Sequence, residues 1–183
     1  LDAVVSNAGI TSPAPLIDLS VSKWDKLLNV NTRATLLLAQ AAYPALKESK
    51  GALVAVASMS GMGAHPGMGA YSPSKAALIS LCQVFAQEWA CDGINVNTVS
   101  PGMIRTPLTQ KVYENNQIAK ERAALVPWGR VGNPEDISNI ISFLLSPEAN
   151  YITGQNILVD GGFVDSLYRH IPGLPDSSEI EKT

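Results

Sequence analysis

Residues 51–102 read GALVAVASMSGMGAHPGMGAYSPSKAALISLCQVFAQEWACDGINVNTVSPG. They hold an apolar run at 52–57, a long helical pattern at 71–90 and, after Gly93, a second apolar run at 94–99. Two short apolar runs separated by a helix predict parallel strands joined by a crossover connection. The helix is apolar nearly all round, so we expect the sheet to cover one side and another subunit to cover the other. Burial within its own domain is the alternative.

The flanking sequence continues this alternation of strands and helices. The expected elements are a strand at 1–6, a helix from Ser20 or Ser22 to about Glu48 with an irregularity near Asn29 and Asn31, a helix within 108–125, a helix capped by Asn133 that ends near Ser146, and a strand at 155–159. Strands alternating with long helices are typical of α/β proteins. The sequence therefore predicts a doubly wound parallel sheet in one domain over residues 1–165, followed by an exposed tail at 166–183.

Composition excludes several classes of function. The chain has 183 residues, a formal net charge of −3 and 46% hydrophobic residues, which gives no electrostatic case for binding nucleic acid or a membrane. Two cysteines and two histidines match no metal-site spacing, so we expect no metal. No segment resembles a signal peptide or a membrane span. We expect a cytoplasmic protein. The alternative is that a targeting segment lies upstream of Leu1.

Ligands of open parallel sheets bind beyond the carboxyl ends of the strands. Those ends carry Asn7-Ala8-Gly9, Ser58, Pro101-Gly102 and Asp160-Gly161-Gly162. Tyr71 and Lys75 follow Ser58 and share one helix face, because they are four residues apart. A neighbouring ammonium favours the phenolate, so we expect Lys75 to lower the pKa of Tyr71 and to prepare it for proton exchange with a substrate oxygen. Ser58 is placed to hydrogen-bond the same oxygen.

Tyr43 and Lys47 repeat the same four-residue spacing. Tyr43 lies near the end of its helix, where the chain is expected to reach the opposite edge of the sheet. Pro44 beside it also marks a helix boundary or kink. We therefore assign Tyr43 a structural role and Tyr71 the chemical one.

With these residues the chain resembles the short-chain dehydrogenase/reductase family from Leu1 to about Phe163. The matching segments are Ser6-Asn7-Ala8-Gly9, Asn29-Val30-Asn31, Ser58 with Tyr71-Ser72-Pro73-Ser74-Lys75, the run from Gly93 to Pro101-Gly102 with Thr106, Thr153-Gly154-Gln155 and Val159-Asp160-Gly161-Gly162. Their order and spacing make the resemblance specific. It implies a Rossmann-like fold, incomplete at its N-terminal half, and an oxidoreductase that transfers a hydride between NAD or NADP and an alcohol or carbonyl substrate.

The resemblance also implies residue roles. Tyr71 would be the general acid/base, Ser58 would orient the substrate oxygen, Lys75 would hold the nucleotide ribose, and Asn31 would hold a water of a proton relay. The implied cofactor contacts are Asn7, Ala8, Gly9, Tyr71, Lys75, Pro101, Gly102, Ile104 and Thr106. The region after Gly102 would be a substrate lid carrying Leu108, Tyr113 and Trp128. A small-molecule alcohol or ketone is the implied substrate, and a homotetramer or homodimer is the implied assembly.

The family's glycine-rich T-G-x-x-x-G-x-G turn does not occur in this sequence. Such a turn supplies backbone amides to the phosphates of a dinucleotide. We expect sequence upstream of Leu1 to carry it. Two rival hypotheses are a non-catalytic fragment or pseudoenzyme that acts as a binding or assembly module, and a serine hydrolase. The hydrolase is disfavoured because the chain has no G-x-S-x-G elbow.

Overall fold

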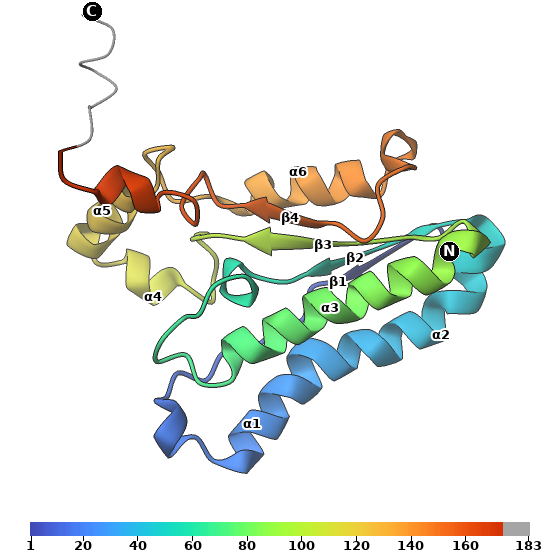
Figure 1. The fold of residues 1–183 in the computed structure, drawn as a ribbon, viewed down its shortest axis with the longest axis horizontal. Coiled ribbons are helices and arrows are strands. Elements are labelled where there is room, and N and C mark those ends of the chain that lie inside the picture. Colours follow the sequence, from blue (N-terminus) through green and yellow to red (C-terminus); the bar gives the residue numbers. More distant parts are fainter. Residues whose placement is uncertain (174–183) are drawn as a thin grey trace, which may run out of the picture.

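A four-stranded parallel sheet forms the centre of the structure, a computed structural model that describes residues 1–173 (Figure 1). Its strands are β1 (Ala3–Ser6), β2 (Ala52–Val56), β3 (Asn95–Pro101) and β4 (Asn156–Val159), and they lie side by side in chain order. Each neighbouring pair is parallel, with Val54 opposite both Val5 and Asn97. The predicted parallel sheet is therefore confirmed.

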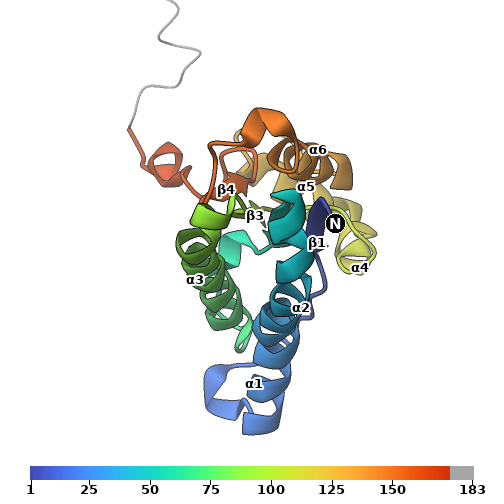
Figure 2. The ribbon, with the colours of Figure 1, turned by 90° about the vertical axis from the view of Figure 1, so that its right-hand side faces the viewer.

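Helices cover both faces of the sheet (Figures 1 and 2). One face carries α2 (Ala34–Ser49) and α3 (Tyr71–Trp89), and the other carries α6 (Pro134–Leu144). Two short helices, α4 (Gln110–Tyr113) and α5 (Asn116–Leu125), lie beyond the carboxyl ends of the strands (Figure 1). The doubly wound arrangement expected from the sequence is thus present. Short 3₁₀ turns complete it at Leu16–Asp18, Met59–Gly61, Ala90–Asp92, Pro147–Ala149 and Leu167–His170.

The continuous apolar run of β2 is explained by these two layers, because successive side chains of a strand point to opposite faces. Leu53 and Ala55 join the core beneath α2 and α3, and Val54 joins the core beneath α6. All three residues are fully buried. A strand with both faces covered has no need of polar alternation.

The long helix near the N-terminus is interrupted where the sequence predicts an irregularity. Ser20 caps α1 (Val21–Leu28) by accepting a hydrogen bond from the backbone N–H of Lys23. A π-helical segment, Asn29–Arg33, then joins α1 to α2. π-Helical turns are rare and are frequently found at functional sites. This one holds Asn31 fully buried.

The single helix predicted within 108–125 is wrong in one respect, since the structure has two helices there. The break falls at Asn115, whose side-chain oxygen accepts hydrogen bonds from the N–H groups of Gln117 and Ile118. Asparagine favours such local bonds over a continuous helix. α5 therefore starts anew at a capped N-terminus.

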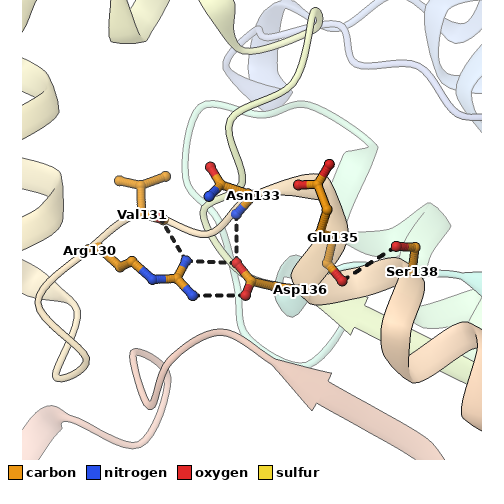
Figure 3. A network of polar contacts seen from close by, with 6 residues as sticks. All are labelled: Arg130, Val131, Asn133, Glu135, Asp136 and Ser138. Carbon is orange, nitrogen blue, oxygen red and sulfur yellow. Dashed lines mark hydrogen bonds and ion pairs between the residues drawn. The ribbon is translucent and has the colours of Figure 1, made fainter.

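The start of α6 lies where Asn133 and Pro134 predict it, and Figure 3 shows the polar contacts around it. Asp136 Oδ2 accepts from the N–H of Asn133 at 2.7 Å and pairs with Nη1 of Arg130 at the same distance, while Oδ1 receives Nη2 at 2.8 Å. The Arg130 guanidinium, and then the Asn133 N–H, hold the pKa of the Asp136 carboxyl well below its usual value. The pair fastens the segment after α5 to α6.

The outer sides of α2 and α3 keep apolar residues at the surface. Leu37 is 55% exposed on α2 and Val84 is 49% exposed on α3. Ser166, at the start of the predicted tail, is buried, whereas Leu167 and Tyr168 are exposed. The rest of that prediction, from residue 174 on, lies outside the described residues. Within residues 1–173 no helix has the length and apolar character needed to cross a membrane.

Candidate active site

A cavity of about 340 Å³ opens at the carboxyl ends of β1, β2 and β3. Its walls come from segments far apart in the sequence: the turn after β1, the residues after β2, the start of α3 and the segment after β3. The lining residues are Asn7, Gly9, Ile10, Val56, Ala57, Ser58, Tyr71, Lys75, Pro101, Gly102, Thr106, Pro107 and Leu108. The structure thus brings together most of the residues that the sequence singled out.

Tyr71 is the first residue of α3, and Ser58 lies two residues after β2. Burial raises the pKa of Tyr71, and the nearby Ser58 hydroxyl acts in the opposite direction. The expectation that Lys75 lowers the pKa of Tyr71 is therefore wrong for this structure. The phenol is mostly removed from water, which disfavours its charged form, and the Ser58 hydroxyl is the group that counteracts this.

Lys75 is almost entirely buried, with 3% of its surface exposed. Its Nζ donates to the carbonyl oxygen of Val56 at 2.8 Å and lies 6.0 Å from the ring centre of Tyr71. Burial lowers the pKa of Lys75 to about 8, because a charged amine loses hydration there. An ammonium has three N–H donors, so Lys75 keeps donors for a ligand in the cavity.

Asn31 connects three segments through its side-chain amide. Its Nδ2 donates to the carbonyl oxygen of Ile10 at 3.0 Å and to the Ser74 hydroxyl at 2.9 Å, and its Oδ1 accepts from the N–H of Ile10 at 2.8 Å. The Ser74 hydroxyl in turn donates to the carbonyl of Tyr71. The amide therefore holds the turn after β1 against the first turn of α3. Sequence reasoning missed Ser74 and Ile10, since neither carries chemistry of its own.

Two glycines lie where a side chain would not fit. A Cβ added to Gly9 would stand 3.3 Å from Nζ of Lys75 and 3.5 Å from Oδ1 of Asn31. A Cβ on Gly102 would stand 2.5 Å from Cβ of Asp160. Gly9 lets a flat ligand approach the backbone beside the ammonium. The ribose and nicotinamide of a dinucleotide fit these residues, because Lys75 offers donors to hydroxyl groups and Gly9 leaves room for them.

Three predicted site residues do not line this cavity. Asn31 lies behind it, in contact with Ile10. Ala8 is exposed beside it. The side chain of Ile104 packs in the core beneath α6 and borders a different cavity with Asp160. Leu108 of the predicted lid lines the cavity, whereas Tyr113 is buried and Trp128 borders the cavity of Ile104 and Asp160.

The second tyrosine–lysine pair lies at the other end of the sheet. The Tyr43 hydroxyl donates to the carboxylate of Asp92, whose other oxygen is 2.7 Å from Nζ of Lys47. The ring of Tyr43 also packs on that of Trp89, with centroids 4.9 Å apart. These contacts join the end of α2 to the end of α3. They agree with the structural role predicted for Tyr43.

Ser60 and His65 form the one hydrogen bond between a serine side chain and a histidine ring recorded in the described part of the chain, with Oγ and Nδ1 3.0 Å apart. A hydrolytic serine needs its histidine to be oriented by a third group. Within residues 1–173 no carboxylate is hydrogen-bonded to His65, and its backbone N–H donates to the Ser72 hydroxyl oxygen. The Ser60–His65 contact therefore helps to fix the loop between β2 and α3. It does not form a catalytic triad, because the third group is missing within residues 1–173.

Comparison with known proteins gives a consistent result. A family model described as enoyl-(acyl carrier protein) reductase matches residues 1–164. The chain is 40% identical over 166 residues to the 3-oxoacyl-(acyl-carrier-protein) reductase FabG of Thermotoga maritima, covering 90% of this chain and 66% of that protein.

Two solved structures show the same fold. A 4-hydroxyisoleucine dehydrogenase complexed with NADH matches at a TM-score of 0.85 and 36% identity, over 90% of this chain and 68% of that one. A gluconate 5-dehydrogenase from Burkholderia cenocepacia J2315, in complex with NADP and tartrate, matches at 0.86 and 27%, over 91% and 66%. The chain spans 61 to 66% of the length of the curated relatives FabG and (3R)-3-hydroxyacyl-CoA dehydrogenase.

Proposed function

The chain belongs to the short-chain dehydrogenase/reductase family, and from that premise we propose that it interconverts an alcohol and a carbonyl compound with NAD or NADP as the hydride carrier. The observation that carries this proposal is the cavity that Ser58, Tyr71 and Lys75 line together. Relatives bound to NADH and to NADP support a nicotinamide cofactor of either kind. The names of the relatives describe reductases and dehydrogenases.

In the proposed reaction Tyr71 exchanges the proton. Its hydroxyl gives a proton to the substrate oxygen during carbonyl reduction and takes one during alcohol oxidation. The Ser58 hydroxyl bonds the same oxygen and positions it. When it is bound, the dinucleotide supplies or accepts the hydride.

Lys75 and Asn31 act around this pair. The Lys75 ammonium, oriented by the Val56 carbonyl, would bind the hydroxyls of the nucleotide ribose and place a positive charge near the phenol. Asn31 keeps the turn at Ile10 against α3 and so keeps Gly9 beside Lys75. Its role in holding a relay water stays a prediction of the resemblance. Asn7, Pro101, Gly102 and Thr106 would contact the nicotinamide end of the cofactor.

The test uses the two tyrosine–lysine pairs of the chain. Tyr71→Phe removes the proton donor and should reduce turnover of a panel of secondary alcohols and ketones by about 10²- to 10⁴-fold. Tyr43→Phe removes a hydroxyl at the far end of the sheet and should leave turnover within about twofold of the unchanged protein. The proposal would be contradicted if both variants lost turnover, or if both kept it. Nucleotide binding without any turnover would favour the alternative, a binding module.

We also propose that copies of this chain associate through the outer faces of α2 and α3, where Leu37 and Val84 are exposed. Exposed apolar groups on neighbouring helices favour association, because contact removes them from water. Val84→Glu should shift the mass measured by analytical ultracentrifugation toward the monomer. Gln83→Glu, at an exposed neighbouring position, serves as the control.

A further inference from the structure

A second cavity, of about 400 Å³, is lined in part by residues that directly follow those of the catalytic cavity in sequence. Met59 and Ser60 in its wall directly follow the catalytic Ser58, and Met103 directly follows Gly102. α5 contributes Arg122 and Leu125 to its wall. Consecutive residues of the same two segments therefore line the two cavities, although no lining residue is common to both.

The wall of this cavity is largely apolar and holds a single group with a permanent charge. Met59, Met103, Leu125 and Phe163 supply the apolar surface. Arg122 supplies the charge, from the last turn of α5, and is half-buried. A guanidinium in partly apolar surroundings needs a partner for its N–H donors, because loss of hydration without compensation is unfavourable.

Arg122 has no carboxylate partner in the described part of the chain. The two ion pairs among residues 1–173 join Lys47 to Asp92 and Arg130 to Asp136. The carboxylate oxygens of Asp160 accept from the backbone N–H groups of Gly162 and Val164, and Val164 lines the cavity. The charge of Arg122 is thus left for a ligand.

Tyr113 holds the guanidinium in place. The Cζ atom of Arg122 lies 5.6 Å from the centre of the Tyr113 ring, and that of Arg105 lies 5.3 Å from it. The ring is 4% exposed, and its buried hydroxyl has no hydrogen-bond partner within residues 1–173. A cation stacked on an aromatic ring keeps its N–H edge available, so the ring orients Arg122 without occupying its donors.

We propose that the substrate is a small organic acid and that Arg122 binds its carboxylate while Ser58 and Tyr71 receive its hydroxyl or carbonyl oxygen. This inference rests on the proposed function, whose cavity supplies the second half of the site. Arginine binds a carboxylate through two parallel hydrogen bonds, which fixes orientation as well as position. A carboxylate at Arg122 would turn one particular carbon of the substrate toward Tyr71.

The test compares hydroxy acids of four to six carbons with their primary amides, which keep the size and remove the charge. With the protein and its cofactor, kcat/KM should be about 10- to 100-fold higher for the preferred acid than for its amide. Arg122→Gln should remove most of that preference by raising KM for the acid, and should leave kcat/KM for the amide almost unchanged. Arg122→Lys should restore part of the preference.

Lys120→Gln is the matched control, since Lys120 is an exposed residue of the same helix and loses the same charge. It should keep the preference for the acid. An equal fall in Lys120→Gln and Arg122→Gln would show a general electrostatic effect and overturn the inference. Equal turnover of acids and amides by the unchanged protein would overturn it as well.

Binding separates failure of this inference from failure of the proposed function. Calorimetric titration of the acid and its amide needs no turnover, and should show the same Arg122-dependent preference. Selective binding of the acid without turnover would reject the dehydrogenase and keep the carboxylate site. A further arm uses a hydroxyacyl thioester of phosphopantetheine: Arg122-dependent turnover of that compound, with none for free acids, would assign the guanidinium to a phosphate and overturn the inference.

Discussion

The ammonium of Lys75 donates a hydrogen bond to the carbonyl oxygen of Val56 at a place that water hardly reaches. Lys75→Met should therefore make the protein more stable at pH 7 and stop its chemistry. Burial lowers the pKa of Lys75 from 10.5 to about 8, a shift that corresponds to roughly 3 kcal/mol. Loss of the bond to Val56 offsets about 1 kcal/mol, which leaves a net gain near 2 kcal/mol in the free energy of unfolding.

The pH dependence of this gain follows from proton binding. Below pH 8 the Lys75 amine is protonated in both the folded and the unfolded protein, so burial of its charge lowers the free energy of unfolding by the full amount. Between about pH 8 and 10.5 the unfolded state binds more protons, so the stability of the unchanged protein rises with pH and the advantage of Lys75→Met disappears. Urea titrations at pH 7 and pH 10 check this, with the exposed Lys26→Met as control. The same gain at both values would contradict it.

Ser58→Ala should change both the rate and the pH profile of alcohol oxidation. The variant lacks the hydroxyl that positions the substrate oxygen, so kcat/KM should fall by about 10²-fold. It also lacks the hydroxyl that lowers the pKa of Tyr71, so the rising limb of the profile should move to higher pH. Initial rates from pH 6 to pH 10 measure the shift. Ser60→Ala, whose hydroxyl contacts His65 instead, should leave the limb in place.

Gly9→Ala should weaken catalysis without unfolding the protein. The new Cβ would lie 3.3 Å from Nζ of Lys75, close enough to displace the ammonium by a few tenths of an ångström. Small displacements of this kind cost about tenfold in kcat/KM. Gly63→Ala is the control, because no atom lies within 4 Å of its new Cβ. Thermal midpoints that match in all three proteins, with activity lost only in Gly9→Ala, are the expected outcome; full activity in Gly9→Ala would refute it.

The start of α6 should be sensitive to acid. Arg130 and the N–H of Asn133 hold the pKa of Asp136 below its usual value, so the folded state favours the carboxylate. Its contribution to stability is complete above the unfolded-state pKa, near 4, and is lost as pH falls below that value. The protection factors of amides near the start of α6, which compare exchange with the intrinsic rate at the same pH, should therefore fall below pH 4. Asp136→Asn should show low protection factors at pH 7 already, and Glu135→Gln should behave like the unchanged protein.

Local signals in the sequence predicted much of this fold. Ser20, the asparagines near 29–31 and the Asn133-Pro134 pair each marked an element end or a break, because their side chains or rings act on the adjacent backbone. The break at Asn115 escaped notice, since the surrounding residues are compatible with one continuous helix. The N–H groups of Gln117 and Ile118 could bond either to backbone carbonyls of a continuous helix or to the Asn115 side chain, and in the structure they bond to the side chain.

The site was predictable in its composition and less so in its electrostatics. Spacing alone placed Tyr71 and Lys75 on one face, but the pKa of Tyr71 depends on how deeply the helix start is buried, which spacing does not give. Arg122 carried no signal of its own, because an arginine on a short polar helix usually faces solvent. Only the fold brings it beside Met59 and Met103.

The π-helical segment at Asn29–Arg33 makes chain length itself part of the site. Removing one residue from that turn would allow an ordinary α-helix from α1 to α2, with better backbone geometry. It would also rotate one half against the other by about 100°, since each residue advances a helix by that angle. Asn31 could then no longer reach Ile10 and Ser74 together. The count of residues between Ser20 and Ala34 is thus fixed by the cavity it serves, whereas surface loops of the same protein have room to grow or shrink.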